Sequence, residues 1–174
     1  MKSSSSKPKR GFSLLELSIA MAMMAALSTA SMVVLRTSQT SWNRHREDHQ
    51  RTQGAAAIVR HIVRNVRQAT AVTAISAPAD TSGTLSLLQL DGSVLVWDHD
   101  NINDQVNFGE TTAGNLFANH VTQLKFVGYK VDGTTPTEET DLIHIIECSV
   151  TYELNRPAGT TTQVLTSRAW VRSW

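Results

Sequence analysis

The first third of the chain is dominated by one long apolar run. Phe12 to Leu35 comprises 24 residues, of which 18 are apolar and one, Glu16, is charged. As a helix this run is about 36 Å long at about 1.5 Å per residue, which is enough to cross a hydrocarbon core of about 30 Å. We therefore predict that residues 12–35 form a transmembrane half-helix.

Beyond Arg36 the helical pattern continues and becomes amphipathic. Apolar side chains recur at spacings of three and four and share one face, whereas arginines gather on the other side. The apolar face consists of Ile58, Val59, Ile62, Val63 and Val66, and the arginines are Arg60, Arg64 and Arg67. Gly54 permits a bend at a cost of about 1 kcal/mol. We predict one helix from Phe12 to about Thr70, with residues 36–70 packed under a head.

From residue 71 the apolar pattern shortens to a period of two, which is typical of strands. Leu85–Leu90 and Val94–Trp97 flank Asp91-Gly92, a strong hairpin signal. Further strands are predicted over Val121–Val131, Leu142–Leu154 and Gln163–Val171, and the polar residues 98–119 are predicted to form a long surface loop. About five mostly antiparallel strands over residues 71–174 then give an α+β fold, a sheet head laid on the helix.

The residues before the apolar run are basic. Lys2, Lys7, Lys9 and Arg10 precede it without any acid, which places the N-terminus in the cytoplasm and the head outside. A secretory signal peptide is the competing interpretation, because Ser28 and Ala30 are small enough for a signal peptidase. Two features argue against it: the apolar run continues past Ala30 to Leu35, and it contains Glu16. A carboxylate in a membrane helix costs a few kcal/mol, so the position of Glu16 needs an explanation.

The junction Lys9-Arg10-Gly11-Phe12-Ser13-Leu14-Leu15-Glu16-Leu17 explains that carboxylate. It closely resembles the class III leader of type IV pilins and type II secretion pseudopilins. The resemblance implies that a prepilin peptidase removes residues 1–11 by cutting after Gly11 and methylates Phe12. Glu16 then occupies the fifth mature position, where the family keeps a glutamate. The ammonium of Phe12 and the carboxylate of Glu16 in a neighbouring helix would neutralise each other in lipid.

The resemblance also implies a function and a place in the cell. The expected protein is a non-enzymatic subunit of a type IV pilus or type II secretion pseudopilus, with a pilin-like α+β fold. It is anchored in the inner membrane by a single pass and assembles with other pilins or pseudopilins. The alternative is a singly anchored or secreted binding protein whose leader merely looks pilin-like. The leader does not separate the pilus from the pseudopilus, which share this helix.

Two segments further resemble the W-type minor pilins and J-type minor pseudopilins. One is the arginine-rich helical stretch 58–69, and the other is the terminal stretch 167–172 with Arg168 and Arg172. Major pilins commonly hold a C-terminal loop with a disulfide. Cys148 is the one cysteine of the sequence, which argues against a major pilin.

The remaining candidate sites favour structural interpretations. His45 and His49 have the i, i+4 spacing of metal ligands, but the flanking arginines would repel a cation. Asp98, Asp100, Asn103 and Asp104 crowd one stretch without the EF-hand spacing, so a solvated loop is favoured over calcium. His144 and Cys148 are predicted to lie on the buried face of a strand. Motifs for phosphate, dinucleotide or Gly-x-Ser-x-Gly chemistry are missing from the sequence, and we predict no enzyme, cofactor or metal.

The charges are distributed unevenly although the whole chain carries +1. Residues 36–70 hold seven arginines and two acids, a net charge of +5, and residues 71–174 hold five bases and twelve acids, a net charge of −7. Basic helices are therefore expected to meet acidic heads of neighbouring subunits. Nucleic acid is a less favoured partner, because the acidic head would repel it and no aromatic residues interleave with the arginines.

Overall fold

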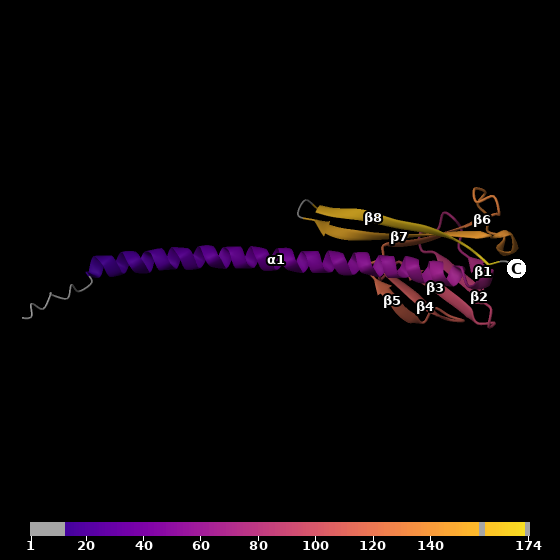
Figure 1. Ribbon diagram of the computed structural model, residues 1–174, viewed down its shortest axis with the longest axis horizontal. Helices are drawn as coiled ribbons and strands as arrows, with labels where there is room; N and C mark the ends of the chain where they lie inside the picture. Colours follow the sequence, from indigo (N-terminus) through magenta and orange to yellow (C-terminus); the bar gives the residue numbers. More distant parts are fainter. Residues whose placement is uncertain (1–12, 157–158, 173–174) are drawn as a thin grey trace, which may run out of the picture. The chain divides into compact units, whose positions relative to one another are not determined.

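The computed structural model describes residues 13–156 and 159–172. The chain divides into two compact units, with the boundary between Arg44 and His45, and each unit is described by itself. The helix α1 (Leu14–Val66) runs through both (Figure 1).

In the first unit, α1 exposes its side chains, and several of its hydroxyl groups form hydrogen bonds within the helix. Ser13 precedes the helix, and its Oγ accepts a hydrogen bond of 3.2 Å from the backbone N–H of Glu16. The hydroxyls of Ser28 and Thr29 donate to the carbonyls of Met24 and Ala25, four residues earlier. Hydroxyls bonded in this way leave no unpaired donor for a hydrocarbon environment.

In the second unit, the rest of α1 buries the predicted apolar face. Its buried side chains are Ala55, Ile58, Val59, Ile62 and Val66. Val63 is partly buried against the same core. The helix ends at Val66 rather than near Thr70, because Ala69 already begins the first strand and is fully buried there. The predicted helix was thus four residues too long.

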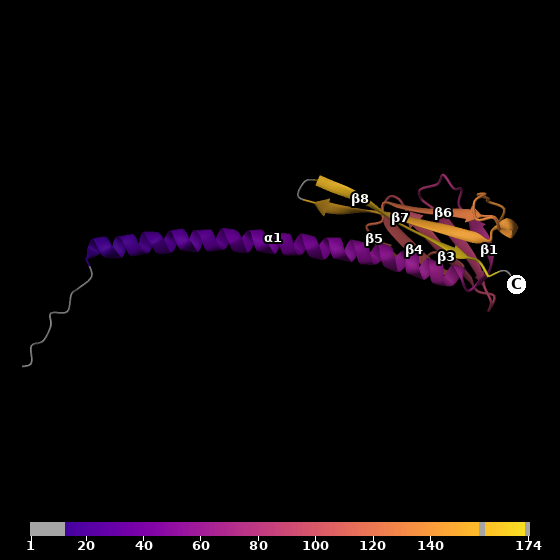
Figure 2. The same ribbon diagram turned by 45° about the horizontal axis from the view of Figure 1, so that its top comes forward.

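The described residues of the head form eight strands in two antiparallel sheets. Figures 1 and 2 show how these sheets are arranged. The five-stranded sheet has the order β1-β2-β3-β4-β5, formed by Ala69–Ile75, Thr84–Gln89, Val94–Asp100, Gln105–Glu110 and Asn115–Asn119. The three-stranded sheet has the order β6-β7-β8, formed by Gln123–Tyr129, Ile145–Arg156 and Gly159–Trp170. A short 3₁₀ helix, η1 (Thr140–Leu142), precedes β7. The α+β, pilin-like architecture predicted from the sequence is confirmed.

The predicted hairpin is present between β2 and β3, which pair in antiparallel register through Leu88 and Val94. At its turn Gly92 has a φ of +86°, a conformation that favours glycine. The Asp91 carboxylate accepts hydrogen bonds from both the backbone N–H and the hydroxyl of Ser93. These bonds hold the pKa of Asp91 below its usual value.

The prediction of a surface loop over residues 98–119 was wrong. This stretch contains the end of β3 and all of β4 and β5. Val106 is completely buried, and Phe108 and Phe117 pack partly buried against the core. Because these few apolar side chains alternate with asparagines and glutamine, the polar composition concealed two half-buried strands.

One hydrophobic core joins α1 to both sheets. It includes Ile58 and Ile62 from the helix, Leu85 and Trp97 from the five-stranded sheet, and Phe126 from β6. All five side chains are inaccessible to solvent. Burial of this kind stabilises a fold by about 1.5–3 kcal/mol per large apolar side chain. The C-terminal part of α1 is therefore an integral element of the head.

Candidate assembly segment

The structure describes the predicted assembly residue Glu16 but not the predicted processing site. Gly11 and Phe12 lie outside the described residues. Glu16 lies in the first turn of α1, three residues after Ser13, and its side chain is exposed. With Ser13 as the N-cap, Glu16 occupies the third helical position, where a glutamate complements the helix dipole. A local role in starting the helix therefore accompanies any role in assembly.

The helix that follows exposes an apolar surface along its whole N-terminal part. The side chains of Leu14, Met24 and Leu35 are 88%, 71% and 61% exposed, respectively. Within the described residues, α1 is the one helix long and apolar enough to cross a membrane, and none of its most apolar stretch is buried. Leaving such a surface in water is unfavourable by about 25 cal/mol per Å², so this segment favours an apolar environment.

The N-terminal segment matches a known family model. Residues 6–32 match the prokaryotic N-terminal methylation motif. The chain carries a type IV pilin-like prepilin signal. No curated protein and no solved structure matches the chain. The signal and the exposed apolar helix together support membrane anchoring of a pilin-like protein. Because the match ends at residue 32, the resemblance of the head to W-type or J-type subunits stays a prediction.

Two contacts that the sequence analysis missed tie the β7–β8 hairpin to the helix. The guanidinium of Arg51 donates a hydrogen bond of 2.9 Å to the backbone carbonyl of Glu153. Nearby, Nη1 of Arg156 lies 3.5 Å from Oδ2 of Asp48. Asp48 and Arg51 are one turn apart on α1, so they contact the hairpin at adjacent points. The two residues of each contact are about a hundred positions apart in the sequence, so no local sequence pattern predicts these contacts.

A second unpredicted feature is a cluster of rings around His61 of α1. The centroids of Phe108 and Phe117 each lie 4.7 Å from that of His61. Nε1–H of Trp97 donates to Nδ1 of His61 at 3.3 Å. Burial, together with the nearby charge of Arg64, lowers the pKa of His61. The hydrogen bond from Trp97 requires the neutral imidazole of His61, because the protonated ring has no acceptor nitrogen.

The metal candidates have other partners. His45 and His49 are exposed on the helix, and Nε2 of His49 lies 2.9 Å from the amide nitrogen of Gln53. Asp98 accepts a hydrogen bond from Thr84, and Asp100 accepts from the backbone N–H of Ile102 within a turn. Within residues 13–156 and 159–172, no group of three or more His, Cys, Asp or Glu is placed to hold a metal ion.

The two buried-face candidates behave differently. Cys148 in β7 is 1% exposed, so its predicted position on the buried face of the strand is confirmed, and burial raises the pKa of its thiol to about 12. His144 is half-buried just before β7, so its predicted core position was wrong. The histidine in the core is His99 of β3, which is 3% exposed and has Nε2 at 2.8 Å from the carbonyl oxygen of Val121.

Proposed function

We propose that this protein is a minor pilin or pseudopilin, a non-enzymatic structural subunit that joins a filament through residues 12–35. The observation that carries the proposal is the methylation motif over residues 6–32. It leads directly into a helical segment whose apolar side chains are exposed. A surface of this kind serves first as a membrane anchor and then as the packing surface of a filament core.

In this proposal a prepilin peptidase removes residues 1–11 after Gly11 and methylates the new amino group of Phe12. The methylated ammonium keeps its positive charge. Glu16 of one subunit then pairs with the Phe12 ammonium of the next, because each charge alone is costly in lipid. Residues 36–70 and 71–174 form the extracytoplasmic part, which contains the head.

The proposed location follows from the same segment. The basic leader keeps the N-terminus in the cytoplasm. Residues 12–35 cross the inner membrane once, and the head lies in the periplasm or outside the cell. The partners are the prepilin peptidase, the inner membrane and other pilins or pseudopilins of a type IV pilus or type II secretion pseudopilus. The arginines of residues 58–69 and the strand containing Arg168 support a place among the minor subunits, including the initiating tip complex.

The mature N-terminus tests the proposal directly. We expect mass spectrometry of the membrane fraction to find a chain that begins with methylated Phe12. Gly11→Leu should remain uncut, because a side chain at this position obstructs the turn that the peptidase accepts. Gly11→Ala, with the smallest added side chain, is the matched control and should retain more processing than Gly11→Leu.

Two outcomes contradict this prediction. A mature protein that begins at Phe12 in Gly11→Leu would show that cleavage does not follow the prepilin pattern. A wild-type chain cut near Ala30 would instead indicate a secretory signal peptide and a secreted binding protein.

A further inference from the structure

The three-stranded sheet has one covered edge and one open edge. At the β6 edge, the N–H of Gly83 donates to the carbonyl of Leu124 at 2.7 Å, and the N–H of Leu124 donates to the carbonyl of Thr81 at 3.0 Å. At the other edge, β8 pairs with β7 along its whole length. No backbone hydrogen bond joins the outer side of β8 to another described residue. Its outer row of N–H and C=O groups is therefore open to a further strand.

The β8 edge also lacks the usual protection against strand addition. Natural edge strands are commonly short, or carry proline, lysine or other charges. In contrast, β8 has 12 residues, and residues 159–167 contain neither a charge nor a proline. Its one charged residue, Arg168, is paired with Glu147 and lies over the ring of Tyr129. By comparison, the edge strand β5 of the other sheet has 5 residues.

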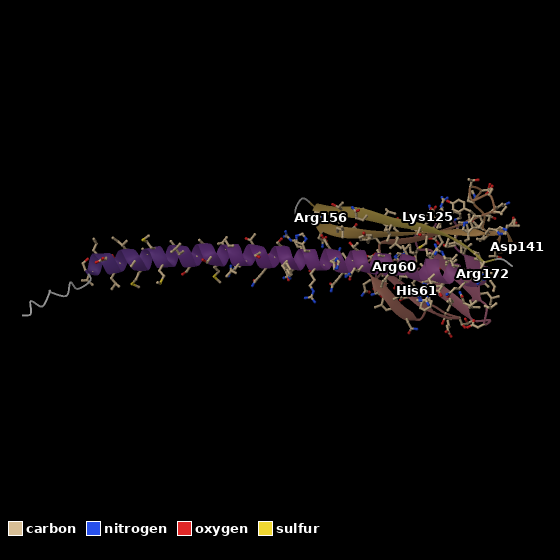
Figure 3. The ribbon with its side chains drawn as sticks, viewed as in Figure 1. Arg60, His61, Lys125, Asp141, Arg156 and Arg172 are labelled. Atoms are coloured by element: carbon tan, nitrogen blue, oxygen red, sulfur yellow. The ribbon has the colours of Figure 1, made fainter. Side chains whose placement is uncertain are left out.

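A basic groove lies beside this open edge. It has a volume of about 390 Å³ and runs between β8 and α1. Its lining residues are Val59, Arg60, Val63, Arg64, Arg67, Gln68 and Ser167. The two valines give an apolar floor. Arg60 and Arg64 are exposed on α1, where Figure 3 labels Arg60, and Arg67 is exposed directly after the helix ends at Val66.

Among the described residues, no acidic side chain forms an ion pair with the arginines of the groove. Nε of Arg60 donates to the carbonyl of Ala56 in its own helix. The two ion pairs among the described residues involve Arg156 and Arg168 instead. Three guanidinium groups that lie beside one another without counter-charges repel each other. A ligand with carboxylates would relieve that repulsion.

We propose that this groove accepts an extended acidic segment of another polypeptide, which adds to β8 as a fourth strand. The backbone of the segment would pair with the open edge of β8, since strand addition supplies affinity through main-chain hydrogen bonds. Alternate side chains would lie on Val59 and Val63, and carboxylates would reach Arg64 and Arg67. That the donor is a neighbouring filament subunit rests on the proposed function, whereas the site itself does not.

A peptide-binding experiment tests the site on the full chain in a zwitterionic detergent. The probe is a fluorescent eight-residue peptide in which valine and glutamate alternate. Two matched peptides carry glutamine in place of glutamate, or N-methyl groups on alternate backbone amides. We expect the acidic peptide to bind, and each matched peptide to bind at least about tenfold more weakly, because one lacks the charges and the other lacks strand pairing.

Matched variants locate the binding. Arg64→Glu reverses a charge in the groove, and its control Arg46→Glu makes the same change at an exposed arginine of α1 outside the groove. Val164→Glu places on β8 a charge of the same sign as the peptide, and its control Leu116→Glu does so on β5. These two side chains are 61% and 54% exposed. We expect the first member of each pair to lose about tenfold in affinity and the second to match wild type.

Several results overturn the proposal. They are an acidic peptide that does not bind, a glutamine or N-methylated peptide that binds equally well, and controls that weaken binding as much as the groove variants. Binding of duplex DNA or phosphatidylglycerol vesicles that Arg64→Glu abolishes, without binding of the acidic peptide, would assign the arginines to phosphate. The assay requires neither leader cleavage nor a filament, so its failure leaves the tests of Gly11 and Glu16 unaffected.

Discussion

At the scale of single residues, His61 makes the stability of the head dependent on pH. Its pKa lies below the ordinary value of 6.5, first because of burial and second because of Arg64. The unfolded chain therefore binds a proton at a higher pH than the folded chain does. The contribution of His61 to the free energy of unfolding is therefore fully present above pH 6.5, and it is lost as the pH decreases through the pKa of the folded state. Protonation would also remove the acceptor for Trp97.

We predict that the free energy of unfolding of the full chain in detergent decreases as the pH is lowered below 6.5. Urea denaturation followed by circular dichroism, on either side of this pH, measures the change. In His61→Gln, which keeps an acceptor but does not titrate, the dependence should become flatter. His45→Gln is the matched control at an exposed helical position and should behave as wild type does. Equal pH dependence in His61→Gln and wild type would exclude His61 as the cause.

At the scale of elements, two glycines with opposite surroundings give a paired test. Gly54 lies within α1, and a Cβ added there meets nothing within 4 Å. Gly54→Ala should therefore stabilise the head by about 0.5–1 kcal/mol through higher helix propensity. At Gly128 in β6, an added Cβ would lie 2.8 Å from the backbone carbonyl oxygen of Thr137 and 2.8 Å from Cδ1 of Ile143. Gly128→Ala should destabilise by about 1–3 kcal/mol.

Denaturant midpoints of the two variants, measured together under one set of conditions, check this prediction. Stabilisation by Gly128→Ala would mean that the segment around Thr137 can move away from β6. Destabilisation by Gly54→Ala would mean that the helix requires a bend at Gly54, which the sequence permits.

The elements that the sequence predicted well are those with a strong local pattern. The helical spacing of Ile58, Val59 and Ile62 indicated the buried face of α1, and Asp91-Gly92 indicated the β2–β3 hairpin. β4 and β5 were missed because Val106 and Phe117 stand among polar residues. Their burial depends on the neighbouring strand and on the ring of His61 in a distant helix, and no local window contains that information.

The same distinction applies to the candidate site. Gly11, Phe12 and Glu16 form a short linear motif, so sequence alone identified the signal that the family model matches. The groove beside β8 joins Arg64 to Ser167 across about a hundred residues. Its arginines were visible as a basic helical face, but the open strand beside them follows from sheet order. The sequence pattern therefore indicated the basic face of the groove, whereas the open edge of β8 became evident only from the order of the strands in the sheet.

At the scale of the whole molecule, the segment preceding the head must gain its stability from outside the chain. The side chains of residues 13–44 are exposed, so they contribute little to a fold on their own. Residues 36–70 carry +5 and residues 71–174 carry −7, so neighbouring copies or related subunits have opposite charges to match. Lipid before assembly, and neighbouring helices after it, would supply the missing contacts.

Glu16 is where this dependence on neighbours can be measured. In lipid an unpaired carboxylate costs about 2.5–3.5 kcal/mol on insertion scales. Pairing with the Phe12 ammonium of another subunit would offset much of that cost and favour association.

We predict that Glu16→Leu leaves cleavage and membrane insertion intact but reduces co-purification with partner pilins by about tenfold or more, a change equivalent to about 1.4 kcal/mol. Glu16→Gln keeps the polar side chain at the helix start while removing the charge, and should show the same loss. The Ser13 Oγ bond, made by the backbone N–H of residue 16, survives in both variants. Glu47→Leu, at an exposed glutamate elsewhere on α1, is the control for removing a carboxylate. Recovery of partners by Glu16→Gln at the wild-type level would show that the charge is not what recruits the subunit, and would leave to Glu16 its role at the start of the helix.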